Sequence, residues 1–260
     1  MKKIILLAVT AMLFISCGGD DDSSNGTANL DYLPLTVGNS WQYDVVTGTV
    51  TLNDILEVSG ESNGSYTLTT TPDPANGLMT GFLASGELSK DPGRLLINGS
   101  LGFNFQGVGD FSIDVMDGPI YDQNANPNQE IFSTSGTFNQ TVQTLDLDIN
   151  YTASNVQLAN EPSITIPAGT YTDVIHSQTI INVTITTDIE ILGLTQTITL
   201  LDPQDVIVID NYWAENVGLI RSDNQLDYEL EDFSGLGFNL PLPQSADILT
   251  VQSLTAATIN

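Results

Sequence analysis

The stretch TLDLDINY, residues 144–151, alternates apolar and polar side chains at every step. In an extended chain its leucines and isoleucine point to one side, while its acidic and amide residues point to the other. The segments INVTITTDIEIL, residues 181–192, and QLDYELEDF, residues 225–233, repeat this alternation. A strand with one apolar and one polar face is typical of an antiparallel sheet that covers a core on one side.

Strand signals of this kind recur about every ten residues from residue 41 onward, and no segment carries a strong 3.6-residue apolar stripe. The run DVIVID, residues 205–210, is apolar on both faces, which predicts a strand that is central or covered on both sides. The tail, residues 245–260, is compatible with a short helix or a strand. We therefore predict a mainly β fold, a single large curved antiparallel sheet or half-barrel with few or no long helices; a β-sandwich is the alternative.

Three Asn-Gly pairs predict turns in this sheet, at residues 63–64, 76–77 and 98–99. Asn-Gly favours the tight turn of a β-hairpin because both residues tolerate positive φ angles. The first pair joins two strand-like segments and predicts a hairpin.

The chain of 260 residues has 32 acidic and 5 basic residues, for a formal charge of −27. So acidic a surface repels phosphate backbones, which excludes nucleic acid as a partner. The hydrophobic fraction of 41% is nevertheless large enough for a sizeable core. Because no later linker divides the chain, we predict one β-rich domain over residues 31–260.

The N-terminus has the pattern of a secretory signal, predicted over residues 1–16. Lys2 and Lys3 precede an uncharged apolar run, residues 4–15, which is shorter than the about 20 residues that span a bilayer. The segment LFISC, which ends at Cys17, resembles the processing box of bacterial lipoproteins. That resemblance implies acylation of Cys17 and attachment to a membrane; the alternative is a secreted protein with a cysteine in its signal.

Residues 17–30, which include GGDDDSSNGTAN, lack apolar periodicity and predict a disordered acidic tether. Acidic residues at Asp20–Asp22 resemble the surface-export signal of Bacteroidetes lipoproteins. We therefore expect an outer-membrane protein at the cell surface, with the periplasmic face of that membrane as the alternative.

Three segments of the domain carry a resemblance: DYLPLTVGNSWQYDV, residues 31–45; ITIPAGTYTDVIHSQTI, residues 164–180; and NYWAENVGLIRSD, residues 211–223. In this order they resemble a family of Bacteroidetes-type envelope lipoproteins. The family motifs are PLxVGNxWxY, PAGxY and YWAxxVGLIR. The resemblance implies a β-rich fold, a curved half-barrel, and no established activity.

These motifs also make sense as structure. Trp41 and Tyr43 lie two residues apart, so both rings share one strand face and can anchor a core. Gly169 permits the positive φ of a turn after Pro167, and Gly218 permits close backbone approach. Arg221 is expected to pair with a carboxylate or stack on an aromatic ring.

The sequence indicates catalytic residues less strongly than it indicates the fold and the lipid anchor. His176, the single histidine, lies in an apparent strand without a nucleophile elbow, so we interpret it as structural and not as a catalytic base. Three acidic pairs have a spacing that puts both carboxylates on one strand face, as a glycosidase would need, but they occupy the polar faces. They are Asp146 with Asp148, Asp188 with Glu190, and Glu229 with Glu231.

The segment DQNANPNQE offers oxygen ligands at alternate positions, as calcium prefers. They are Asp122, Asn124, Asn126 and Glu130. Pro127 occupies the position where an EF-hand loop requires glycine, so we interpret the segment as an Asn-rich turn. We predict no metal and no cofactor.

The function these observations favour is that of a non-enzymatic outer-membrane lipoprotein whose β domain binds a ligand, a lipid or other apolar molecule, on the concave face of its sheet. Such a module predicts an apolar cavity of a few hundred Å³. A structural or protein-interaction component of the envelope is the alternative, and predicts a filled interior with an external apolar patch. A carboxylate hydrolase, the third hypothesis, predicts two inward-facing acids across a cleft.

Overall fold

The computed structural model describes residues 30–105, 109–143, 145–191, 193–232 and 243–260. Within these ranges the chain forms thirteen strands and one short helix, α1 (Leu78–Ala84). The strands are β1 (Ser40–Thr47), β2 (Val50–Ser62), β3 (Ser65–Thr71), β4 (Glu87–Asp91), β5 (Arg94–Phe105), β6 (Gly109–Asp122), β7 (Gln129–Val142), β8 (Leu145–Gln157), β9 (Glu161–Ile166), β10 (Gly169–Ile191), β11 (Leu194–Ala214), β12 (Gly218–Glu229) and β13 (Ser245–Thr258).

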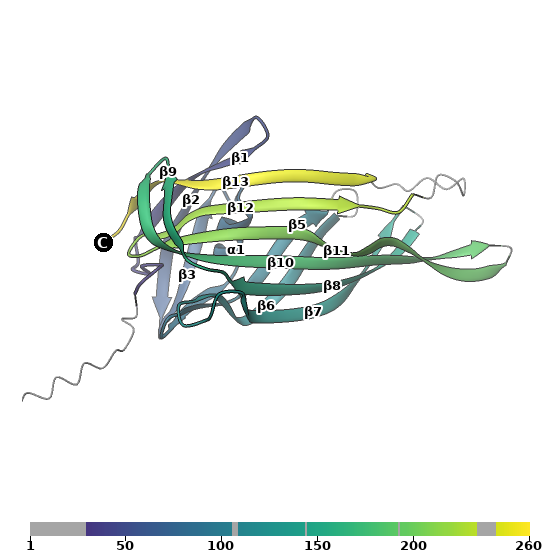
Figure 1. The fold of residues 1–260 in the computed structure, drawn as a ribbon, viewed down its shortest axis with the longest axis horizontal. Coiled ribbons are helices and arrows are strands. Elements are labelled where there is room, and N and C mark those ends of the chain that lie inside the picture. The colour runs from purple at the N-terminus through teal and green to yellow at the C-terminus, as the bar shows by residue number, and fades with distance from the viewer. Residues whose placement is uncertain (1–29, 106–108, 144, 192, 233–242) are drawn as a thin grey trace, which may run out of the picture.

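All strands belong to one antiparallel sheet, in the order β6-β5-β4-β3-β2-β1-β13-β12-β11-β10-β8-β7, with β9 paired only to β10. The sheet curves into a flattened, nearly closed barrel in which β10 to β13 form one layer and β2 to β6 lie behind it (Figure 1). The prediction of a single large curved sheet is confirmed. The sandwich alternative is wrong because one continuous sheet forms both layers.

The alternation read from the sequence matches the burial along the strands. On β8, Leu145, Leu147 and Ile149 are buried and the residues between them are exposed. The run in β11 is buried at Val206, Ile207 and Ile209 and half-buried only at Val208, as expected for a strand covered on both faces. The tail forms a strand, β13, which pairs with both β1 and β12.

The three Asn-Gly pairs behave differently from one another. Asn63 and Gly64 form the expected hairpin turn, with φ angles of 53° and 82° and Ser62 paired to Ser65. The pair at residues 76–77 forms a bend that leads into α1. The turn predicted at residues 98–99 is wrong, because both residues lie inside β5.

The reason is that Gly99 serves a tertiary contact. A Cβ atom at Gly99 would lie 2.6 Å from the hydroxyl of Ser85, so glycine admits the turn that follows α1. The pairing of β5 with β6 also shifts register between Ile97 and Gly99, which marks an irregularity inside the strand.

One end of the barrel, here called the packed end, joins the segments that resemble the lipoprotein family. Trp41 Nε1 donates to the carbonyl of Val217 (2.5 Å), and the Tyr43 hydroxyl donates to the carbonyl of Leu219 (2.9 Å). Gly218 has a φ of 118°, and a Cβ there would lie 2.9 Å from Trp41 Nε1. The expected close approach at Gly218 is thus confirmed.

The middle segment joins the same end. Pro167 and Ala168 form the predicted turn between β9 and β10, and Gly169, with a φ of 151°, pairs with Ile166. Further along β10, Ile175 pairs with Trp213 of β11. The three segments therefore build one packed core at this end. Leu30, the first described residue, lies there as well, bonded to Gln123 in the β6–β7 loop.

The barrel has a seam between β6 and β7, where no strand pairing is formed. Buried side chains from β8 bridge it: Asn155 Nδ2 donates to the carbonyls of Pro119 (2.7 Å) and Ile120 (2.8 Å). Further along, the Phe111 ring of β6 contacts the Phe138 ring of β7, with centroids 5.3 Å apart. None of the described residues forms a helix long and apolar enough to cross a bilayer.

Candidate functional site

The strongest sequence-predicted site residue, Cys17, lies outside the described residues, as do the predicted signal (1–16) and all of the predicted tether (17–30) except Leu30. Acylation of Cys17 therefore stays a prediction.

The calcium candidates lie at the end of β6, in the β6–β7 loop and at the start of β7. Asp122 Oδ1 accepts from the backbone amide of Asn124 (2.8 Å), and the Asn126 amide group bonds to Gln129. These contacts close the loop as the Asn-rich turn that was expected, and Glu130 lies exposed on β7. The described residues contain no group of three or more His, Cys, Asp or Glu side chains arranged to hold a metal.

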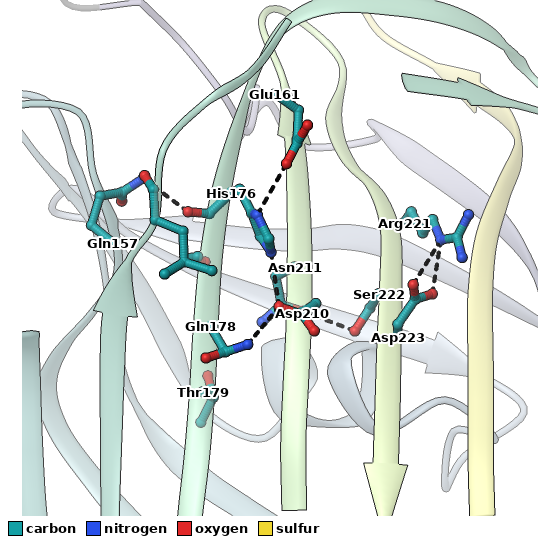
Figure 2. A network of polar contacts seen from close by, with 12 residues as sticks. Gln157, Glu161, His176, Gln178, Thr179, Asp210, Asn211, Arg221, Ser222 and Asp223 are labelled. Atoms are coloured by element: carbon teal, nitrogen blue, oxygen red, sulfur yellow. Dashed lines mark hydrogen bonds and ion pairs between the residues drawn. The ribbon is translucent and has the colours of Figure 1, made fainter. Parts of the chain in front are cut away.

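His176 lies in β10 on the outer face of the sheet, between two carboxylates (Figure 2). Its Nε2 is 2.8 Å from Asp210 Oδ1 and its Nδ1 is 3.6 Å from Glu161 Oε1. Its ring stacks on Tyr212, with centroids 4.4 Å apart. Since both ring nitrogens face carboxylates, neither is directed at a nucleophile, and the interpretation of His176 as a structural residue fits this geometry.

The surrounding charges reinforce this cluster. Burial alone would raise the pKa of Asp210, but hydrogen bonds from His176 and Gln178, with the attraction of His176, lower it below the ordinary value. Burial and the nearby Asp210 carboxylate raise the pKa of Tyr212 to about 12. Arg221 Nε donates to both carboxylate oxygens of Asp223 (2.8 and 3.0 Å), which confirms the expected pairing with an acid.

The three acidic pairs considered for hydrolysis are all exposed on strand faces or strand ends. Two of their members bond to threonines on the neighbouring strand: Asp146 to Thr141 and Asp188 to Thr197. Asp54 is the acidic side chain that is buried among the described residues. Its carboxylate is already hydrogen-bonded. Oδ1 accepts from Asn76 N, and Oδ2 accepts from Gly77 N (2.8 Å) and from the Thr80 hydroxyl at the start of α1.

The inner face of the sheet carries a feature that the sequence reasoning missed, a continuous row of buried polar residues. Neighbouring strands pair these residues in register across β8, β10, β11, β12 and β13. The members of this inner polar row are Gln157, Ser177, Asn211, Ser222 and Gln252, all of them buried. On β11 the row separates Trp213, in the core of the packed end, from Ile209, in the second apolar core.

Some polar atoms of this row are well bonded and others are not. Ser222 donates to Asn211 Oδ1 (2.8 Å), as Figure 2 shows. Gln252 Nε2 and Oε1, and Asn211 Nδ2, make no hydrogen bond within the described residues, and neither does the buried Oδ1 of Asn224. The Gln252 amide lies against Gly77, where a Cβ atom would collide with it.

Next to these atoms, further along the strands than the packed end, is an open groove of about 560 Å³. We call it the distal groove. It lies between α1 with its preceding loop and strands β1, β5, β11, β12 and β13, and both Gly77 and Asn224 line it. Its wall mixes apolar side chains with amides and hydroxyls, and none of the described residues that line it is Asp, Glu, Lys, Arg or His.

A mainly apolar cavity lies under the seam, beside Phe82, Ile113 and Phe132, but has a volume of only about 30 Å³. That is room for about two water molecules and far less than a lipid needs. The described core therefore does not contain the expected apolar cavity of a few hundred Å³. The distal groove has a suitable volume, but its wall is a mixture of polar and apolar side chains.

No protein-family model matches the chain, and no curated protein sequence matches it. Among solved structures, the chain is similar to a protein described as a "putative lipoprotein" from Parabacteroides distasonis ATCC 8503. The two share 14% sequence identity over 88% of this chain and 99% of that one, with a TM-score of 0.38. The case for a function rests on the residues of this chain.

Proposed function

We propose that this chain is a non-enzymatic lipoprotein of the bacterial outer membrane that is displayed at the cell surface and binds a small ligand in the distal groove. The observation that carries the binding role is the groove itself. Its volume of about 560 Å³ lies in the range of ligand sites, and it is open to solvent.

The position of the chain's N-terminal part supports the anchoring role. Leu30 lies at the packed end, thirteen residues after Cys17. The tether predicted from the sequence would span about 20 Å at that length. A lipid on Cys17 would thus hold the packed end near the membrane, with the groove further along the strands. Acyl chains attached in this way give a stable anchor when two or more are present.

The arrangement of ionisable groups supports a role in binding instead of catalysis. His176 has a carboxylate at each ring nitrogen, and Asp54 is engaged at the start of α1. The acidic pairs are exposed, so they do not face one another across the groove.

A second candidate is a protein-interaction role in the cell envelope. It is favoured by the β1–β2 hairpin, where Val50 and Leu52 are 56% and 47% exposed and share one face. Exposed apolar side chains that lie together in a patch often mark a site of contact with another protein.

Native mass spectrometry of the protein extracted from its own host membranes tests the proposal. We expect a mature chain that begins at an acylated Cys17 and carries a bound small molecule. Gly102→Trp places a bulky ring in the groove wall, where a Cβ atom meets no neighbour nearer than 3.8 Å, and should abolish that bound mass. Thr51→Trp, at an exposed position on β2, is the matched control.

Three outcomes would contradict parts of the proposal. A mature chain that keeps residues 1–16 and an unmodified Cys17 would refute the anchor. A bound mass that Gly102→Trp leaves unchanged, or none at all, would refute binding in the groove. A co-purified envelope protein whose binding is lost on Leu52→Asp would favour the second candidate.

A further inference from the structure

We infer that the ligand of the distal groove is an uncharged, hydroxyl-rich molecule of the saccharide class. This inference deepens the proposed function and rests on it. It follows from three observations: the charge of the groove wall, the mixture of side chains in that wall, and the buried polar atoms beside the groove.

The charge of the wall argues against an ionic ligand. The chain has 32 acidic residues, yet none of those that the structure describes lines the groove, and no described basic side chain lines it either. A carboxylate, phosphate or ammonium group that entered would lose hydration without gaining an opposite charge, which is costly. The strong negative charge of the whole chain would in addition repel anions.

The mixture of side chains argues against a fatty acid or other hydrocarbon. Ser100, Asn224 and Thr250 bring hydroxyl and amide groups into the wall from three different strands. An acyl chain packed on them would remove their water and offer no hydrogen bonds in return, which is unfavourable. Phe82 and Phe103 supply apolar surface in the same wall, against which the C–H face of a sugar ring can pack.

Buried polar atoms that make no hydrogen bond within the described residues lie beside the groove. Asn224 Oδ1 is a buried acceptor and the Gln252 amide offers both an acceptor and a donor, and all three atoms make no hydrogen bond within the described residues. Gln252 is only 2% exposed and lies against Gly77 of the groove wall. A hydroxyl group can act as donor and acceptor at once, so a polyol can pair with the side-chain amide of Asn224, which lines the groove.

Saturation-transfer-difference NMR on the mature chain tests the inference. The chain must be held in a polyoxyethylene detergent, since detergents with sugar headgroups would compete. The probes are a panel of neutral mono- and oligosaccharides of hexoses, pentoses and N-acetylhexosamines, with galacturonic acid and lauric acid as the charged and the apolar comparison. We expect saturation transfer to at least one neutral saccharide and to neither comparison probe.

Two substitutions locate the site. Asn224→Leu removes the amide at similar volume and should weaken the binding saccharide by about tenfold or more, because the groove then leaves a ligand hydroxyl unpaired. Gln225→Leu, on the outer face of the same strand, is the matched control and should leave the dissociation constant unchanged.

The outcomes separate this inference from the proposed function. Binding of lauric acid, blocked by Gly102→Trp, with no saccharide bound would overturn the inference and leave the groove as a ligand site. The absence of saturation transfer to every saccharide of the panel would also overturn it. Saccharide binding that Asn224→Leu leaves intact would place the ligand elsewhere and refute the assignment to this groove.

Discussion

Replacing the glutamine of the inner polar row that makes no hydrogen bond should stabilise the protein. Gln252 is 2% exposed, and neither atom of its amide has a partner within the described residues. A buried polar group without a partner costs about 1–3 kcal/mol. Methionine has nearly the same length and is flexible enough to fill the same space. We therefore expect Gln252→Met to raise the free energy of unfolding by about 1–2 kcal/mol.

Gln157 offers a matched comparison in the same row. It is 3% exposed, but its amide donates to the carbonyls of His176 (3.1 Å) and Leu158 (3.4 Å), and its Oε1 accepts from Asp122 N (3.1 Å). Gln157→Met leaves these backbone groups without their hydrogen bonds to Gln157 and should lower the free energy of unfolding by about 1–3 kcal/mol. The two substitutions are chemically identical, so opposite signs isolate the effect of the hydrogen bonds.

Urea unfolding followed by tryptophan fluorescence measures both effects, since Trp41 and Trp213 are fully buried and should report the loss of the core. The denaturant slope must be the same in the three proteins for the midpoints to be compared. A loss of stability in Gln252→Met equal to that in Gln157→Met would mean that the Gln252 amide is bonded in solution, and the reasoning would be refuted.

Three further predictions concern other parts of the molecule. Gly218→Ala should lower the free energy of unfolding by about 2 kcal/mol or more in the same urea assay, because its Cβ would press on Trp41 at a φ of 118°; wild-type stability would contradict this. The lowered pKa of Asp210 contributes stability above about pH 4 that is lost as the pH falls through the folded-state pKa. The stability difference between wild type and Asp210→Asn should thus be largest near pH 7 and shrink below pH 4; a difference independent of pH would disprove the role of that charge. Cys17→Ala should move the protein out of the membrane fraction and abolish labelling with palmitate, and an unchanged distribution would exclude the anchor.

Those parts of the fold that depend on local pattern were predictable from the sequence. Leu145, Leu147 and Ile149 face the core because side chains alternate along any strand, and Asn63-Gly64 forms a hairpin turn through its own backbone preferences. The Asn-Gly pair at residues 98–99 has the same sequence as that turn but lies inside β5, because the contact with Ser85 outweighs the local preference for a turn.

The sequence contains a signal for the inner polar row, but this signal can be interpreted only once the strand pairing is known. Asn211 lies between Ile209 and Trp213, at a position where the apolar face of the strand leads one to expect a third apolar residue. Such an exception gains meaning when its neighbours in the sheet are known. Ser177 and Ser222 flank it on the adjacent strands, and that register comes from pairings between segments far apart in the chain.

The distal groove depends on long-range pairing even more strongly. Thr47, Ser100 and Asn224 lie on β1, β5 and β12, and closure of one curved sheet is what brings them to a common wall. The positions of the acidic residues in the alternating strands depend instead on local sequence, because the alternation with neighbouring apolar residues puts each acid on the polar face. A chain of charge −27 can therefore keep an uncharged groove at little cost, provided that the acids occupy outward positions and the inward polar positions are filled by amides and hydroxyls. Asp54, the buried exception, does not change this, since the start of α1 already satisfies its carboxylate.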